Sequence, residues 1–103
     1  MDKLQKFELM NKIVRELEDL QNSQNALITK IGHIEVDNMN GLNDSYLETN
    51  LSDMHSKIAE NVDAVTEIFA HFERQRDEYG EKNSAAIAAA EAAAAIAAAE
   101  SAS

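Results

Sequence analysis

Residues 51–79 read LSDMHSKIAENVDAVTEIFAHFERQRDEY, and a seven-residue repeat runs through this stretch. The repeat forms two rows of mostly apolar side chains: Leu51, Ile58, Val65, Phe72 and Tyr79 in one, and Leu47, Met54, Asn61, Ile68 and Gln75 in the other. Rows that alternate steps of three and four residues fall on one stripe of a helix, as in coiled coils. The pattern predicts a helix over about residues 45–79, with Ser45 and Glu48 as a capping box and Gly80 as a left-handed C-cap.

The same repeat occurs in the first part of the chain. Its rows are Ile13, Leu20, Leu27 and Ile34, and Met10, Leu17, Gln24 and Ile31, with Val14 and Ile28 at one side of the stripe. Asp2, with Gln5 three residues later, fits the N-terminus of a helix. We therefore expect a first helix over about residues 2–35.

The segment between these helices, residues 36–44, reads VDNMNGLND. Asn, Asp and Gly favour turns, and Asn40-Gly41 is the expected tight point. A short connection between helices of similar length predicts an antiparallel hairpin, in which facing residues have numbers that add up to about 80–82. The 103 residues include no proline and no cysteine, which agrees with an all-α fold of the coiled-coil type.

The last twenty residues, SAAIAAAEAAAAIAAAESAS, differ from the hairpin of residues 1–83, because the heptapeptide AAIAAAE occurs twice in them. Alanine is the strongest helix former, so we expect an Ala-rich C-terminal helix in residues 84–103. Three origins fit this tail: a natural low-complexity segment, an engineered spacer, or alanines that stand as placeholders. Only Ile87 and Ile96 are large enough to anchor it, and their spacing of nine residues places them on opposite sides.

The predicted stripes are wider than the two-row seam of a coiled coil, which is typical of helices in bundles of three or four. We expect the hairpin to contribute to such a multi-helix bundle by packing against other helical subunits. The expected interface comprises Met10, Ile13, Val14, Leu17, Leu20, Leu27, Ile28, Ile31, Leu51, Met54, Ile58, Val62, Val65, Ile68, Phe69 and Phe72.

Three amides, Gln24, Asn61 and Gln75, interrupt the stripes. Buried amides at such positions fix the register and the number of partners, whereas in a loose seam they meet water. The expected pairing places Gln24 near Ile58, so a partner amide for Asn61 is better sought in another chain.

Charge is distributed unevenly along this chain of net charge −10. Residues 1–31 hold five acidic and five basic side chains, whereas residues 32–83 hold twelve acidic and four basic ones. An acidic second half repels nucleic acid and anionic membranes, so we expect neither as a partner. Self-association has to keep the acidic helices apart, which favours a hetero-complex over a homodimer.

The sequence contains no motif for catalysis or for binding a cofactor. His33, His55 and His71 lack companion ligands, although Glu67 lies four residues before His71. The only glycines are Gly32, Gly41 and Gly80, so there is no Gly-rich phosphate loop. We expect no enzyme activity, no metal site and no cofactor.

The N-terminal residues MDKLQKFELM carry charges and include no apolar run. This pattern predicts no signal peptide, and no segment of bulky apolar residues is long enough to span a membrane. We therefore expect an intracellular protein, cytoplasmic or nuclear.

In length, acidity and lack of cysteine, the predicted hairpin resembles the small W-x-G helical-hairpin proteins of type VII secretion. The turn tripeptide of that family corresponds here to Met39-Asn40-Gly41, so the tryptophan is missing. The acid that the family carries four residues after a tyrosine is replaced by Asn83, which follows Tyr79 at that distance. The chain is equally similar to short coiled-coil subunits of helical-rod complexes, such as kinetochore or tethering assemblies.

These observations favour a non-catalytic coiled-coil subunit that serves as a scaffold or adaptor in a multi-protein complex. Two alternatives remain: a small secreted or chaperone-like hairpin dimer, which the type VII resemblance implies, and an engineered helical protein whose natural part is residues 1–83.

Overall fold

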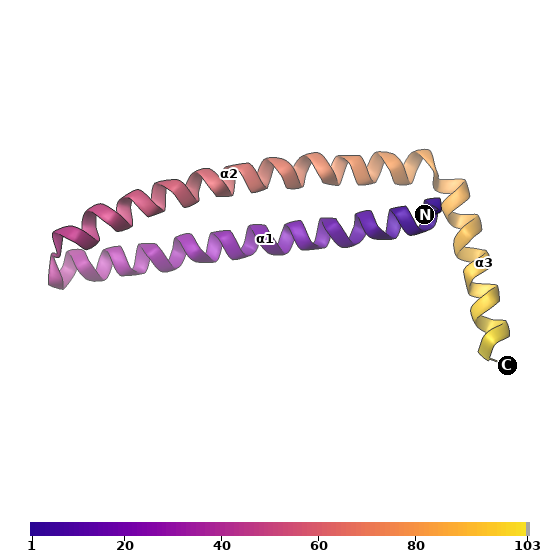
Figure 1. Ribbon diagram of the computed structural model, residues 1–103, viewed down its shortest axis with the longest axis horizontal. Coiled ribbons are helices and arrows are strands. Elements are labelled where there is room, and N and C mark those ends of the chain that lie inside the picture. The colour runs from indigo at the N-terminus through magenta and orange to yellow at the C-terminus, as the bar shows by residue number, and fades with distance from the viewer. Residues whose placement is uncertain (103) are drawn as a thin grey trace. The chain divides into compact units, whose positions relative to one another are not determined.

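The computed structural model describes residues 1–102, which form helices joined by short connections and contain no strand. Helix α1 spans Lys3–Asp37, a π-helical turn (η1) spans Asn38–Leu42, α2 spans Ser45–Lys82 and α3 spans Ser84–Ala102 (Figure 1). The all-α prediction is confirmed. Helix α1 ends two residues later than predicted, and α2 ends three residues later.

The chain divides into two compact units. The hairpin unit comprises Glu16–Phe69, and the terminal unit combines Met1–Arg15 with the chain from Ala70 onward. Within the hairpin unit, α1 and α2 run side by side in opposite directions and are joined by η1 (Figure 1).

Side-chain caps define where α1 and α2 begin. At α1, the backbone N–H of Gln5 donates to Asp2 Oδ1 over 2.7 Å, and the Asp2 N–H donates to Gln5 Oε1 over 3.1 Å. This reciprocal pair confirms the predicted start. At α2, the cap is Asp44, whose Oδ1 accepts from the Leu47 N–H over 2.9 Å. Ser45 was the predicted cap, but it is already the first helical residue.

A buried amide closes the turn of the hairpin. Asn38 Nδ2 donates to the Asp44 carbonyl over 3.0 Å, and the Asp44 N–H donates to Asn38 Oδ1 over 2.9 Å. Asn43 adopts the left-handed conformation with a φ of 55°, whereas no glycine has a positive φ among the described residues. The reversal therefore depends on Asn38 and Asn43, and the prediction of a tight point at Asn40-Gly41 is wrong.

Two rows of α1 face two rows of α2 in the hairpin unit, and we call these four rows the seam. On α1 and the start of η1 the seam residues are Leu17, Gln21, Gln24, Ile28, Ile31, Glu35 and Asn38; on α2 they are Leu51, His55, Ile58, Val62, Val65 and Phe69. All are buried or half-buried, and Ile31 and Leu51 are the most enclosed apolar members.

The register of the hairpin follows from a hydrogen bond across the seam. Gln21 Nε2 donates to Thr66 Oγ1 over 2.9 Å, so facing residues have numbers that add up to about 87. The predicted value of 80–82 assumed that the chain reverses at Asn40. The difference arises because the reversal extends over Asn38–Leu42 and continues to Asp44.

In the terminal unit, the N-terminal part of α1 packs closely against the end of α2. A Cβ added at Gly80 would lie 2.6 Å from Phe7 Cε1, so a larger residue would collide with the ring. Arg76 Nη1 donates to Asn11 Oδ1 over 3.3 Å, and Lys6 Nζ lies 5.0 Å from the centroid of the Tyr79 ring. Gly80 therefore allows close packing inside α2. The prediction that it ends the helix is wrong, because α2 continues to Lys82.

The Ala-rich helix α3 has one buried anchor in the same unit. Ile87 is 6% exposed, whereas Ile96 is 60% exposed. The two isoleucines thus lie on different sides of the helix, as their spacing predicted, and only Ile87 contributes to packing.

Candidate partner-binding face

Both helices of the hairpin unit carry an apolar row outside the seam. We call this set the outward strip; it consists of Leu20, Leu27 and Ile34 on α1, and Met54, Asn61 and Ile68 on α2. Its five apolar members are between 43% and 55% exposed. A seven-residue repeat links the members on each helix, so they form continuous rows.

The two outward rows lie on the same side of the hairpin. Each member of the outward strip comes directly before a seam residue, as Leu20 precedes Gln21 and Asn61 precedes Val62. The helices of an antiparallel pair are related by an approximate two-fold axis, so equivalent positions on them share one side. The hydrogen-bond register then places Leu20 level with Ile68, Leu27 with Asn61, and Ile34 with Met54.

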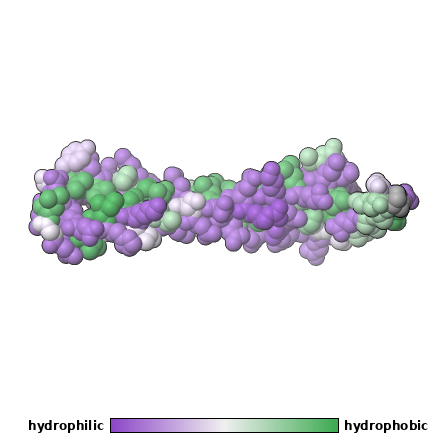
Figure 2. All heavy atoms as spheres, turned by 90° about the horizontal axis from the view of Figure 1, so that it is seen from below, coloured by the Kyte–Doolittle hydropathy of each residue, from purple (hydrophilic) through white to green (hydrophobic). Residues whose placement is uncertain are grey.

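A shallow hollow near the turn supports this placement. Ile34 from α1 and Leu47, which continues the outward row of α2, line the same hollow with Leu42 of η1. Its remaining lining residues are Asp37 and Asn38. Hydrophobic atoms gather at the turn end of the hairpin among hydrophilic ones (Figure 2). The turn adds further exposed apolar side chains there: Val36, Met39, Leu42 and Tyr46.

Few charged side chains flank the outward strip, and their signs balance. The rows beside it, three or four residues from its members, hold two acidic and two basic residues within the hairpin unit: Glu16, Asp37, Lys30 and Lys57. Within the hairpin unit, four of the five acidic residues of α2 lie one or two positions from a strip member, which turns them about 100° or more away. The strip is therefore flanked by balanced charge, and the acidic surface of α2 faces elsewhere.

The structure divides the predicted interface residues into two groups. Most lie in the packed interior of a unit: Met10, Val14, Leu17, Ile28, Ile31, Leu51, Ile58, Val62, Val65, Phe69 and Phe72 are buried or half-buried. Leu20, Leu27, Met54 and Ile68 belong to the outward strip, and Ile13 is half-buried. The expected stripe had the row of Leu20 and Leu27 at its centre and Ile28 at its side, whereas in the structure Ile28 lies in the seam and Leu20 and Leu27 lie outside it.

The three amides that interrupt the repeat have different environments. Gln24 lies in the seam, and its Oε1 is buried without a hydrogen-bond partner. Asn61 and Gln75 are exposed. Asn61 occupies the middle of the outward strip, where it is the only polar member. Packing of a partner over the strip would therefore have to satisfy the Asn61 amide.

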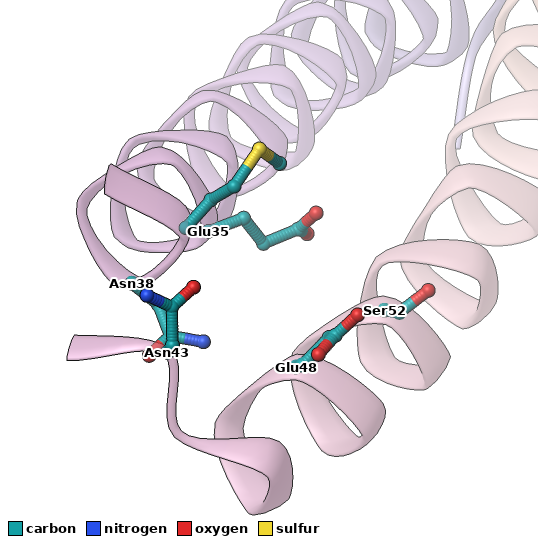
Figure 3. A pocket seen from close by; sticks show the side chains of 6 residues that line it. Glu35, Asn38, Asn43, Glu48 and Ser52 are labelled. Carbon is teal, nitrogen blue, oxygen red and sulfur yellow. The ribbon is translucent and has the colours of Figure 1, made fainter. Parts of the chain in front are cut away.

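A polar hollow of about 270 Å³ lies near the turn. Glu35 from α1 and Glu48 and Ser52 from α2 line it, together with Asn38, Met39 and Asn43 (Figure 3). One carboxylate oxygen of Glu35 is buried without a hydrogen-bond partner. Residues 1–102 contain no group of three or more His, Cys, Asp or Glu side chains arranged to hold a metal ion.

Helix α3 is long and apolar enough to cross a membrane by length and composition alone, and little of it is buried. Glu91 and Glu100 lie within it. A charged side chain at the centre of a bilayer costs roughly 2.5–3.5 kcal/mol on insertion scales. Alanine contributes little hydrophobic gain to offset this cost.

Comparison of this chain with protein families, with curated proteins and with solved structures finds no match.

Proposed function

We propose that the chain is a non-catalytic subunit of a helical bundle, which uses the outward strip to pack against other helices as a scaffold or adaptor. The observation that carries this proposal is the exposure of Leu20, Leu27, Ile34, Met54 and Ile68 along one side of the hairpin unit. Each large apolar side chain gains roughly 1.5–3 kcal/mol when it is fully buried.

The extent of the strip supports this role. Its rows cover three levels of the hairpin, from Leu20 and Ile68 to Ile34 and Met54, and Leu42 and Leu47 continue it at the turn. Single exposed apolar residues are ordinary, but a contiguous patch of this kind marks an interaction site in soluble proteins. A partner helix would supply the missing cover, with a core of three or four helices as the result.

The test is the mass of the assembly that contains the chain, measured on a tagged full-length chain recovered from cells under native conditions. Leu27→Asp places a charge in the outward strip, and Ala26→Asp places the same charge on an exposed neighbouring position outside the strip. We expect wild type and Ala26→Asp to sediment as an assembly heavier than one chain, and Leu27→Asp to sediment as a single helical chain.

Two results would contradict the proposal. One is a single wild-type chain at all concentrations up to tens of micromolar, both in cell extracts and after purification. The other is a Leu27→Asp assembly as heavy as that of wild type. Circular dichroism on each variant shows whether the helices persist, so that loss of assembly is distinguished from loss of folding.

A further inference from the structure

We propose that the occupant of the outward strip is a second copy of this chain, stacked face to face and antiparallel, with the two Asn61 amides paired at the centre. This inference rests on the proposed function and specifies its partner. It follows from the order of the residues in the strip, from the position of Asn61 and from the distribution of charge.

The strip is symmetric about its middle level. Leu27 and Asn61 form that level, and the levels of Leu20 with Ile68 and of Ile34 with Met54 lie one heptad away on either side. A two-fold axis through the middle, perpendicular to the helices, places each outer level of one copy over the opposite outer level of the other. Every apolar side chain of the strip then meets an apolar side chain, as a self-complementary two-fold interface requires.

The same axis satisfies the only polar member of the strip. An amide offers both N–H donors and a carbonyl acceptor, so two Asn61 side chains facing each other can exchange hydrogen bonds. A two-fold axis parallel to the helices would instead place Asn61 against Leu27 of the other copy and leave the amide without a partner. Buried Asn pairs of this kind fix register and orientation in coiled coils.

Charge opposes the second copy only weakly at the strip itself. The acidic surface of α2 lies away from the strip, and the flanking rows carry two residues of each sign. The preference for a hetero-complex was based on keeping the acidic helices apart. In this arrangement the two α2 helices lie over each other, but their acidic sides point away from the contact. Glu16 of one copy lies level with Asp37 of the other at the rim, where salt screens such pairs. We therefore expect association to be tighter at moderate than at very low ionic strength.

Sedimentation equilibrium on the purified full-length chain tests the identity of the partner. We expect a dimer at tens of micromolar, and Asn61→Asp should weaken association by at least about 100-fold because two carboxylates would meet without a counter-charge. Asn22→Asp, at an exposed position of α1 outside the strip, is the matched control and should leave association unchanged.

Single cysteine variants test the orientation, because the chain has no cysteine of its own. With diamide as the oxidant, Asn61→Cys and Leu27→Cys should each form a symmetric disulfide dimer in high yield. Ser56→Cys, an exposed position of α2 outside the strip, should not. In the parallel-axis arrangement, neither cysteine variant would cross-link with itself, and a mixture of the two would cross-link; that pattern would overturn the antiparallel assignment.

The failure of this inference differs from the failure of the proposed function. If the purified chain is monomeric and helical at tens of micromolar but belongs to a heavier assembly in cell extract, the occupant of the strip is a different protein. That result would overturn this inference and leave the proposed function standing. A single chain under both conditions would overturn both. A dimer that Asn61→Asp does not weaken would place the self-contact elsewhere and would also overturn the inference.

Discussion

The two sides of α1 in the hairpin unit reverse the usual distribution of polar and apolar residues. The rows that face α2 include three polar residues, Gln21, Gln24 and Glu35, whereas the outward row consists of Leu20, Leu27 and Ile34. A hairpin that folded only for itself would gain more by turning its apolar row inward. The contrast indicates that polar residues of the seam help to set the register of the hairpin, and it supports the proposal that the outward row packs against a partner.

The most direct test of this contrast truncates one residue on the seam side of α1 and one on its outward side. Ile31 is buried in the seam, and Leu27 is 44% exposed in the outward strip. Ile31→Ala should lower the free energy of unfolding by about 2–5 kcal/mol, because it leaves a cavity. Leu27→Ala should lower it by less than about 1 kcal/mol while the chain is monomeric.

Urea unfolding followed by circular dichroism, at concentrations low enough to prevent association, measures both effects. Equal losses for Ile31→Ala and Leu27→Ala would mean that the seam is assigned to the wrong rows. At high concentration, the cost of Leu27→Ala should grow, because the truncation then also removes contacts with the partner.

A substitution at the turn tests whether the buried amide of Asn38 determines the register. Asn38→Asp keeps the oxygen that accepts from the Asp44 N–H but removes the donor to the Asp44 carbonyl. We expect a loss of about 1–3 kcal/mol in the free energy of unfolding, since a buried carboxylate oxygen would then face the Asp44 carbonyl, which keeps only its hydrogen bond from the Glu48 N–H. Asn40→Asp makes the same change at an exposed position of η1 and should have little effect. If Asn38→Asp leaves the free energy of unfolding unchanged, the buried amide does not determine the register.

The helices themselves were predictable from the sequence, because a seven-residue repeat fixes which residues share a stripe. The choice among neighbouring rows was not, because Leu20, Leu27 and Ile34 are more apolar than the seam residues that pack in their place. Periodicity places rows on a helix, but it does not say whether a row faces its own hairpin or another chain. The register was missed because Asn38 reaches across to Asp44, a contact that no local turn pattern indicates.

A stabilising substitution tests whether the polar residues of the seam lower the stability of the hairpin. Gln24 Oε1 is buried without a hydrogen-bond partner. Gln24→Leu removes the unpaired oxygen and should raise the free energy of unfolding by about 1–2 kcal/mol. Asn25→Leu adds the same apolar side chain at the next, exposed position and should give no such gain. If Gln24→Leu destabilises the chain, its amide has a partner in solution.

Two glycines extend the comparison between packed and open positions to the terminal unit, with the smallest expected effect. Nothing lies within 4 Å of a Cβ added at Gly32, so Gly32→Ala should stabilise the chain by about 0.5–1 kcal/mol through reduced backbone freedom. Gly80→Ala offers the same gain, but its Cβ would lie 2.6 Å from Phe7 Cε1. The ring must shift, so we expect no net gain, or a loss.

Replacing Phe7 by Leu shortens the opposing side chain, and Gly80→Ala in that background should recover most of the Gly32→Ala gain. The two single variants and the double variant form a cycle whose coupling measures the contact. A Gly80→Ala variant as stabilising as Gly32→Ala, with no coupling to Phe7, would show that the ring does not pack against α2.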